Sequence, residues 1–138
     1  MARVMAVDYG TKRVGLAVTD ALQMIASPLD TIHSKDVVAY IAQYHQTNEL
    51  ETLVVGLPKQ MDGSLNEVEV HIKDFIKKVK QKLPHLHIER VDERFTSKLA
   101  MASMISAGAT KKQRAEKGNI DKVSAAIILQ SYLESKAY

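Results

Sequence analysis

Alternating apolar positions dominate the first 33 residues of the chain. They are Val4, Ala6, Val14, Leu16 and Val18, spaced by two within each of two runs. A period of two is typical of β-strands, and Gly10 lies between the runs, where a turn is needed. A third run covers residues 25–33, after a turn at residues 20–24. The opening of the chain is therefore predicted to be an antiparallel meander of three strands.

Helical periodicity begins at Ser34. Apolar residues recur at 3.6-residue spacing over residues 34–48, with Ser34 or Asp36 as the N-cap. A second helix is predicted over residues 68–83, after a capping box in which Ser64 stands three residues before Glu67. Two more helices are predicted, one over residues 96–107, ended by Gly108, and one over residues 121–135.

Two short runs, residues 53–57 and 86–91, separate these helices and are predicted strands. The first run is wholly apolar and ends at Pro58, as expected of a strand buried on both faces in a parallel sheet. Helical crossovers return the chain parallel to the preceding strand. The predicted fold is α/β, in the order βββαβαβα with one extra short helix before the last. Its mixed five-stranded sheet has three antiparallel strands and then two parallel ones, flanked by helices.

Composition then narrows the class of protein. The chain has 138 residues, of which 46% are hydrophobic and 25% are charged, and it has no cysteine. This length suits one domain, and the absence of cysteine excludes disulfides and thiolate zinc sites. The sequence shows neither a signal peptide nor a long apolar segment. We therefore expect a single domain over residues 1–138, in the cytoplasm and without membrane contact.

Positive charge is concentrated in one stretch of the sequence. The net charge of the chain is +3, and residues 108–123 hold five basic and two acidic residues, an excess equal to that of the whole chain. Lys111 and Lys112 lie at the centre of this stretch. It reads either as a solvated surface loop or as a contact for a polyanion such as nucleic acid, and Lys111 and Lys112 would then bind the substrate.

Carboxylates follow the predicted strands at the edge where open α/β sheets bind ligands. Asp8 ends the first strand, Glu93 follows the last, and Asp121 opens the last helix. Three like charges repel one another unless a cation lies between them. Carboxylate oxygens are hard ligands suited to Mg²⁺ or Mn²⁺, and such ions activate water for phosphodiester hydrolysis. The residue types therefore match a divalent metal site with nuclease or polymerase chemistry.

Two of these acidic positions also have a purely structural interpretation. Asp121 stands where an aspartate would cap a helix N-terminus, and residues 92–94 form a charged strand end with a local ion pair. Asp8 is harder to explain in this way, because a charge directly after an apolar run is unusual unless it is paired or metal-bound.

Four blocks of sequence carry a resemblance to a known family. They are residues 6–15 (AVDYGTKRVG), residues 54–58 (VVGLP) followed by 62–64 (DGS), residues 92–97 (DERFTS) and residues 120–126 (IDKVSAA). On these blocks the chain resembles, nearly end to end, the YqgF or RuvX family of the RNase H-like superfamily. Members of that family are described as Holliday junction resolvases or as nucleases for the 5′ end of the small-subunit ribosomal RNA precursor.

The resemblance implies an RNase H-like fold and an acidic active site on Asp8, Glu93 and Asp121, which would also hold Mg²⁺ or Mn²⁺. It implies that Lys12, Arg13 and Arg94 lie near the phosphates of the substrate. The expected partner is nucleic acid, either structured RNA or branched DNA. The expected function is processing of the 5′ end of pre-16S rRNA, with resolution of Holliday junctions as the alternative.

Two rival functions come from other classes. A non-catalytic RNA-binding assembly factor would use the same basic residues around an idle site. A phosphate loop of the sugar-kinase type would use Gly10, Thr11 and Gly15 as a turn that holds a nucleotide. The chain has the length of only one of the two domains that such kinases close over ATP. We expect a monomer or a weak homodimer, because junction resolution needs two cuts while trimming one RNA end does not.

Overall fold

The computed structural model of the chain describes residues 2–58, 67–92 and 117–136. Within these ranges five strands form one mixed sheet: β1 (Arg3–Tyr9), β2 (Arg13–Thr19), β3 (Ala26–His33), β4 (Leu50–Leu57) and β5 (His87–Asp92). Three helices accompany the sheet, namely α1 (Val37–Thr47), α2 (Glu69–Lys82) and α5 (Lys117–Lys136). The predicted α/β order is confirmed for this part of the chain. The helix predicted over residues 96–107 lies outside it.

The strands lie side by side in the order β3-β2-β1-β4-β5. β1 pairs antiparallel with β2, and β2 pairs antiparallel with β3. β4 pairs parallel with both β1 and β5. The chain therefore moves outward from β1 on one side, through β2 and β3, and on the other side through β4 and β5. The boundary between β1 and β4 is a topological switch point, and the carboxyl ends of β1, β4 and β5 meet at one edge of the sheet.

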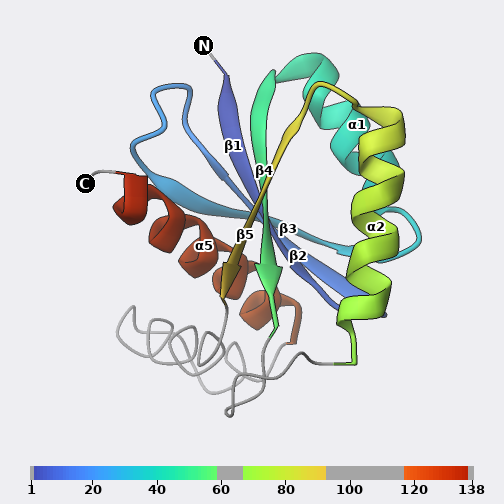
Figure 1. Ribbon diagram of the computed structural model, residues 1–138. Coiled ribbons are helices and arrows are strands. Elements are labelled where there is room, and N and C mark those ends of the chain that lie inside the picture. Colours follow the sequence, from blue (N-terminus) through green and yellow to red (C-terminus); the bar gives the residue numbers. More distant parts are fainter. Residues whose placement is uncertain (1, 59–66, 93–116, 137–138) are drawn as a thin grey trace.

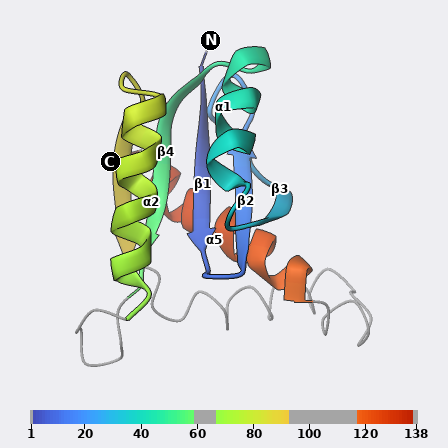
Figure 2. The same cartoon turned by 90° about the vertical axis from the view of Figure 1, so that its right-hand side faces the viewer.

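Helices cover the two faces of the sheet unequally (Figures 1 and 2). Among the described helices, α1 and α2 lie side by side on one face, and α5, drawn in red, crosses the other. Alternation along β1 divides its side chains between the two faces. Met5 and Val7 belong to the core under α1 and α2, while Val4 and Ala6 belong to the core under α5. The central strand is thus buried on both sides.

The two cores differ in composition. The core under α1 and α2 contains larger side chains, among them Leu16, Ile41, Leu53, Ile72 and Phe75. The core under α5 contains Val4, Ala6, Ala17, Val54, Ala125, Ile128, Leu129 and Tyr132. The small residues of this second core let α5 approach the sheet closely. In the described ranges no helix is both long and apolar enough to cross a lipid bilayer.

Helix starts differ from those predicted. Asp36 precedes α1 but its side chain makes no cap hydrogen bond, and the Ser34 hydroxyl instead donates to the Thr11 carbonyl oxygen at 2.5 Å. α2 begins at Glu69, with Val68 at the cap position and Glu67 in a turn. The predicted capping box was therefore wrong for Glu67, and Ser64 lies outside the described residues. The apolar positions of α2 were predicted correctly, because Ile72, Phe75 and Val79 are buried.

Candidate active site

The carboxyl end of β1 brings Asp8 to the face covered by α5. Asp8 continues the series of Val4 and Ala6, and side chains on a strand alternate between faces. Its register partner on β2 is Gly15. Directly opposed residues of antiparallel strands point to the same face of the sheet. The side chain of Asp8 and the hydrogen that Gly15 has in place of a side chain therefore both face α5.

Gly15 determines how closely α5 approaches the sheet. A Cβ atom added to Gly15 would lie 2.0 Å from the backbone oxygen of Asp121 and 2.8 Å from the backbone nitrogen of Lys122. No carbon fits at these distances, so the helix backbone occupies the space that any other residue would need. The contact places Asp121 beside the register partner of Asp8. Two of the three predicted carboxylate residues are therefore brought to one place, on one face, at the carboxyl end of the central strand.

Asp121 lies inside α5 and does not cap it. The helix spans Lys117–Lys136, so Asp121 is its fifth residue and lies beyond the first turn, which contains no acidic residue. The helix was predicted to begin at residue 121, and that prediction was wrong. The correction removes the capping interpretation of Asp121, because the unsatisfied backbone N–H groups of a helix belong to its first four residues.

Arg13 is the ion-pair partner of Asp121. It is the first residue of β2 and lies two residues before Gly15, on the same face of the sheet. Its Nε donates a hydrogen bond to Oδ2 of Asp121 at 2.8 Å. The side chains are 44% and 25% exposed, respectively, so water and solutes reach this ion pair. The positively charged guanidinium of Arg13 is thus bound to Asp121, which is one of the predicted metal ligands.

The β1–β2 turn holds the other predicted phosphate contact, Lys12, which is exposed. Gly10 lies in this turn, where an added Cβ would come within 2.6 Å of the Arg13 carbonyl oxygen. Gly15 is different, because it lies inside β2 and pairs with Asp8. The idea that Gly15 belongs to a phosphate-holding turn was therefore wrong, and its lack of a side chain serves helix packing.

Four predicted site residues lie outside the described residues: Glu93, Arg94, Lys111 and Lys112. Their roles stay predictions. Within residues 2–58, 67–92 and 117–136, no three potential metal-ligating side chains come together. The described part of the chain thus supplies two of the three predicted carboxylates, Asp8 and Asp121, and the third is Glu93 by sequence alone.

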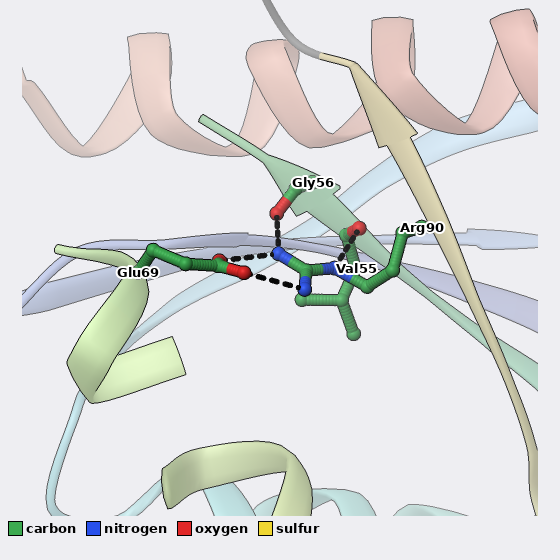
Figure 3. Close-up of polar contacts among 4 residues, drawn as sticks. All are labelled: Val55, Gly56, Glu69 and Arg90. Atoms are coloured by element: carbon green, nitrogen blue, oxygen red, sulfur yellow. Dashed lines mark hydrogen bonds and ion pairs between the residues drawn. The ribbon is translucent and has the colours of Figure 1, made fainter. Parts of the chain in front are cut away.

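Sequence reasoning missed a second ion pair on the opposite face of the sheet (Figure 3). The Arg90 guanidinium on β5 donates to both carboxylate oxygens of Glu69, at 3.0 and 2.6 Å. The same group donates to the carbonyl oxygens of Val55 at 3.2 Å and Gly56 at 3.0 Å. The Glu69 side chain is 6% exposed. The signal that was available is a positive charge in the middle of a predicted strand, which needs a partner.

These contacts join three elements next to the candidate site. Arg90 ties the carboxyl end of β4 to the first residue of α2, and it does so from β5. A bidentate arginine–carboxylate pair fixes orientation as well as distance. The geometry of this edge of the sheet is therefore held by a buried clamp, which is the name we use below for Arg90 and Glu69 together.

Comparisons with known proteins agree with the predicted resemblance. A sequence model of the RuvX family, described as Holliday junction resolvase, matches residues 2–135. A protein of Christiangramia forsetii named "Putative pre-16S rRNA nuclease" is 49% identical over 133 residues, which cover 96% of this chain and 98% of that protein. A protein of Bacteroides thetaiotaomicron with the same name is 45% identical over 138 residues, covering 100% of both.

A solved structure supports the fold. The structure described as "T. thermophilus RuvC in complex with Holliday junction substrate" matches with a TM-score of 0.56 over 99% of this chain and 96% of that chain. The two sequences are 15% identical, so the likeness concerns the fold. The predicted RNase H-like arrangement of a mixed five-stranded sheet with flanking helices is confirmed.

Proposed function

Because this chain belongs to the RuvX family, we propose that it is a metal-dependent nuclease that hydrolyses phosphodiester bonds at the 5′ end of pre-16S rRNA. The name shared by its full-length relatives supports this substrate. The family description favours a second candidate, the Holliday junction, as substrate. Both substrates are polyanions whose reacting group is a phosphodiester, so the same site chemistry serves either one.

The convergence of Asp8 and Asp121 is the observation that carries the proposal. Asp8 lies opposite Gly15, and the backbone of Asp121 rests on that glycine. Two carboxylates collected from the first strand and the last helix have no structural need for each other, and neither caps a helix. Such an arrangement is expected where a function requires negative charge in one place.

The residues present fit a hard divalent cation. Carboxylate oxygens are the ligands that Mg²⁺ and Mn²⁺ prefer, and the ion pair with Arg13 indicates that this location favours positive charge. Asp8, Asp121 and, by sequence, Glu93 would hold the ion. When bound, the ion supplies Lewis-acid chemistry, activating a water and stabilising the leaving oxygen.

Basic residues beside the carboxylates would bind the substrate backbone. Lys12 lies in the β1–β2 turn and Arg13 follows it as the first residue of β2, at the same edge of the sheet. Arg94, Lys111 and Lys112 are assigned to the phosphates by sequence. Positively charged side chains orient a phosphodiester and contribute a salt-dependent part of the affinity. The proposal keeps a monomer or weak homodimer as the form of the protein and the cytoplasm as its location.

A cleavage panel tests the proposal. A four-way DNA junction, duplex DNA, single-stranded RNA and pre-16S rRNA are incubated with the protein in Mg²⁺ and in Mn²⁺. We expect metal-dependent cleavage of the ribosomal precursor, lost in Asp8→Asn, Glu93→Gln and Asp121→Asn. Preferential cutting of the junction would assign the second candidate substrate. Binding of RNA without cleavage of any substrate would indicate the non-catalytic assembly factor and overturn the proposal.

Thermal melts supply a control that does not depend on the choice of substrate. A ligand stabilises only the state that binds it, so Mn²⁺ should raise the melting temperature of the wild-type protein. The same titration should raise the melting temperature of Asp8→Asn, Glu93→Gln and Asp121→Asn much less. An equal response to Mn²⁺ in all four proteins would contradict the metal site.

A further inference from the structure

The Arg13–Asp121 ion pair occupies a ligand of the proposed metal site. The carboxylate oxygen Oδ2 of Asp121 accepts the hydrogen bond from Nε of Arg13 at 2.8 Å. A guanidinium and a divalent cation compete for the same lone pairs on a carboxylate. The guanidinium takes up a lone pair of Oδ2, and its positive charge repels a divalent cation bound through either oxygen of Asp121, so we expect metal loading to weaken this hydrogen bond.

The fold holds Arg13 next to Asp121 from two directions. Arg13 starts β2 on the face that α5 covers, and two residues later Gly15 contacts the Asp121 backbone. The arginine therefore lies beside this aspartate by strand geometry, without relying on a chance side-chain conformation. The pairing is a consistent feature of the site, so it has consequences for whatever binds there.

The ion pair between Arg13 and Asp121 is nevertheless weak enough for each residue to exchange the other for a different partner. Both side chains are reached by solvent, at 44% and 25% exposure, and exposed ion pairs contribute little to stability. The buried clamp is less accessible and has more bonds, since Arg90 and Glu69 are 25% and 6% exposed and Arg90 also donates to two backbone carbonyls. Arg13 is thus held weakly enough to move when a better anion arrives.

A phosphodiester is such an anion. Arginine binds phosphate oxygens through the same planar set of N–H donors that binds a carboxylate. When a nucleic-acid phosphate reaches this edge of the sheet, the guanidinium gains a second acceptor and its hold on Asp121 is weakened. Asp121 is then free to bind a cation.

We propose that Arg13 is an internal counter-cation that couples metal binding to substrate binding. Without nucleic acid it neutralises Asp121 and weakens the affinity for Mg²⁺ or Mn²⁺. With nucleic acid it turns to the phosphate, and the affinity for metal rises. By thermodynamic linkage the metal raises the affinity for nucleic acid by the same factor. The inference rests on the proposed nuclease function, and it assigns Arg13 a role toward Asp121 in addition to phosphate contact.

Direct titration of Mn²⁺ tests the first half of the inference. Free Mn²⁺ is measured by its electron paramagnetic resonance signal for the wild type, Arg13→Gln and Lys12→Gln, without nucleic acid. Lys12→Gln removes the same charge from the neighbouring position and controls for the general loss of repulsion. Arg13→Gln should bind Mn²⁺ about fivefold more tightly than Lys12→Gln, the factor that corresponds to the strongest exposed ion pairs. Equal affinities in the two variants would overturn the inference.

Adding nucleic acid tests the second half. The titrations are repeated with a saturating phosphorothioate oligonucleotide, whose linkages resist hydrolysis. The wild-type affinity for Mn²⁺ should rise severalfold, and the affinity of Arg13→Gln should change much less. A rise of the same size in both proteins would contradict the coupling. The titration without nucleic acid decides whether Arg13 weakens the affinity for Mn²⁺, even if Arg13→Gln binds the oligonucleotide weakly.

One further variant separates this inference from the proposed function. Asp121→Asn should lose Mn²⁺ binding, whatever Arg13 does. Wild-type affinity for Mn²⁺ in Asp121→Asn would overturn the metal site itself. Loss of binding in Asp121→Asn together with equal affinities of Arg13→Gln and Lys12→Gln would keep the metal site and refute only the role of Arg13.

Discussion

Two arginine–carboxylate pairs join a strand to a helix on opposite faces of the same sheet. Arg90 on β5 binds Glu69 on α2, and Arg13 on β2 binds Asp121 on α5. The closest N–O distances are similar, at 2.6 and 2.8 Å. Their burial differs by degree, since the side chains of Arg90 and Glu69 are 25% and 6% exposed and those of Arg13 and Asp121 are 44% and 25% exposed.

The number of bonds and the degree of burial determine what each pair can do. Arg90 makes four hydrogen bonds, two of them to backbone carbonyl oxygens that cannot move away, so the pair locks its three elements together. For Arg13 the described ranges show a single bond from Nε to Asp121. Equal residue types therefore serve as a fixed clamp where they are buried and as an exchangeable contact where water reaches them.

The largest effect is expected from breaking the clamp. Glu69→Ala removes two of the four hydrogen bonds of the Arg90 guanidinium, whose side chain is 25% exposed. The variant should cost about 3 kcal/mol of unfolding free energy, at the lower end for breaking a buried ion pair. Urea unfolding followed by circular dichroism measures this loss. The control is Asp74→Ala on the same helix, which breaks the exposed pair between Asp74 and Lys78 and should cost at most about 0.5 kcal/mol. Equal losses in the two variants would show that burial does not distinguish the pairs.

The second effect concerns the close approach of α5. Gly15→Ala forces a carbon into the space of the Asp121 backbone, so the helix must shift. We expect a loss of about 2 kcal/mol, in the range of other overpacked sites. Because the shift moves Asp121 away from Asp8, the variant should also lose affinity for Mn²⁺. Gly15→Ala with wild-type stability and wild-type Mn²⁺ affinity would refute the packing that joins the two carboxylates.

The sequence predicted the described part of the fold well, because its strands and α2 have strong periodicity. The apolar run of residues 53–57 lies in β4, which pairs parallel on both sides as predicted. The start of α5 was predicted less well. Its first residues, Lys117 to Asn119, are polar or glycine and give no apolar repeat, so the predicted helix began only at residue 121.

The site was predicted in part. The sequence pointed to Asp8 and Asp121 through a charge after an apolar run and through family motifs, and the structure brings these two residues close together, while their catalytic role stays a prediction. The roles of Gly15 and Arg90 depend on contacts between residues far apart in the chain. Gly15 meets a backbone more than one hundred residues later, and Arg90 meets Glu69 on a different element. No local sequence pattern indicates such contacts. A charge inside a predicted strand was the available hint of the Arg90–Glu69 pair.

The smallest effect is expected at Arg13, and it tests whether the Arg13–Asp121 pair is weak enough to exchange partners. A double-mutant cycle with Arg13→Gln and Asp121→Asn should give a coupling free energy of about 0.2–1 kcal/mol at low salt, as for other exposed pairs. Raising the salt to 1 M shortens the Debye length to about 3 Å, so this coupling should fall toward zero. Urea unfolding of the four proteins at both salt concentrations measures it.

The same cycle with Arg90→Gln and Glu69→Gln provides the contrast, because a buried pair is screened much less by salt. Its coupling should exceed that of the Arg13–Asp121 pair and change little between the two salt concentrations. A salt-insensitive coupling above about 2 kcal/mol for Arg13 and Asp121 would have the opposite meaning, since exposed pairs do not reach it. Asp121 would then be locked to Arg13 as firmly as Glu69 is to Arg90, and neither a metal ion nor a phosphate would separate them.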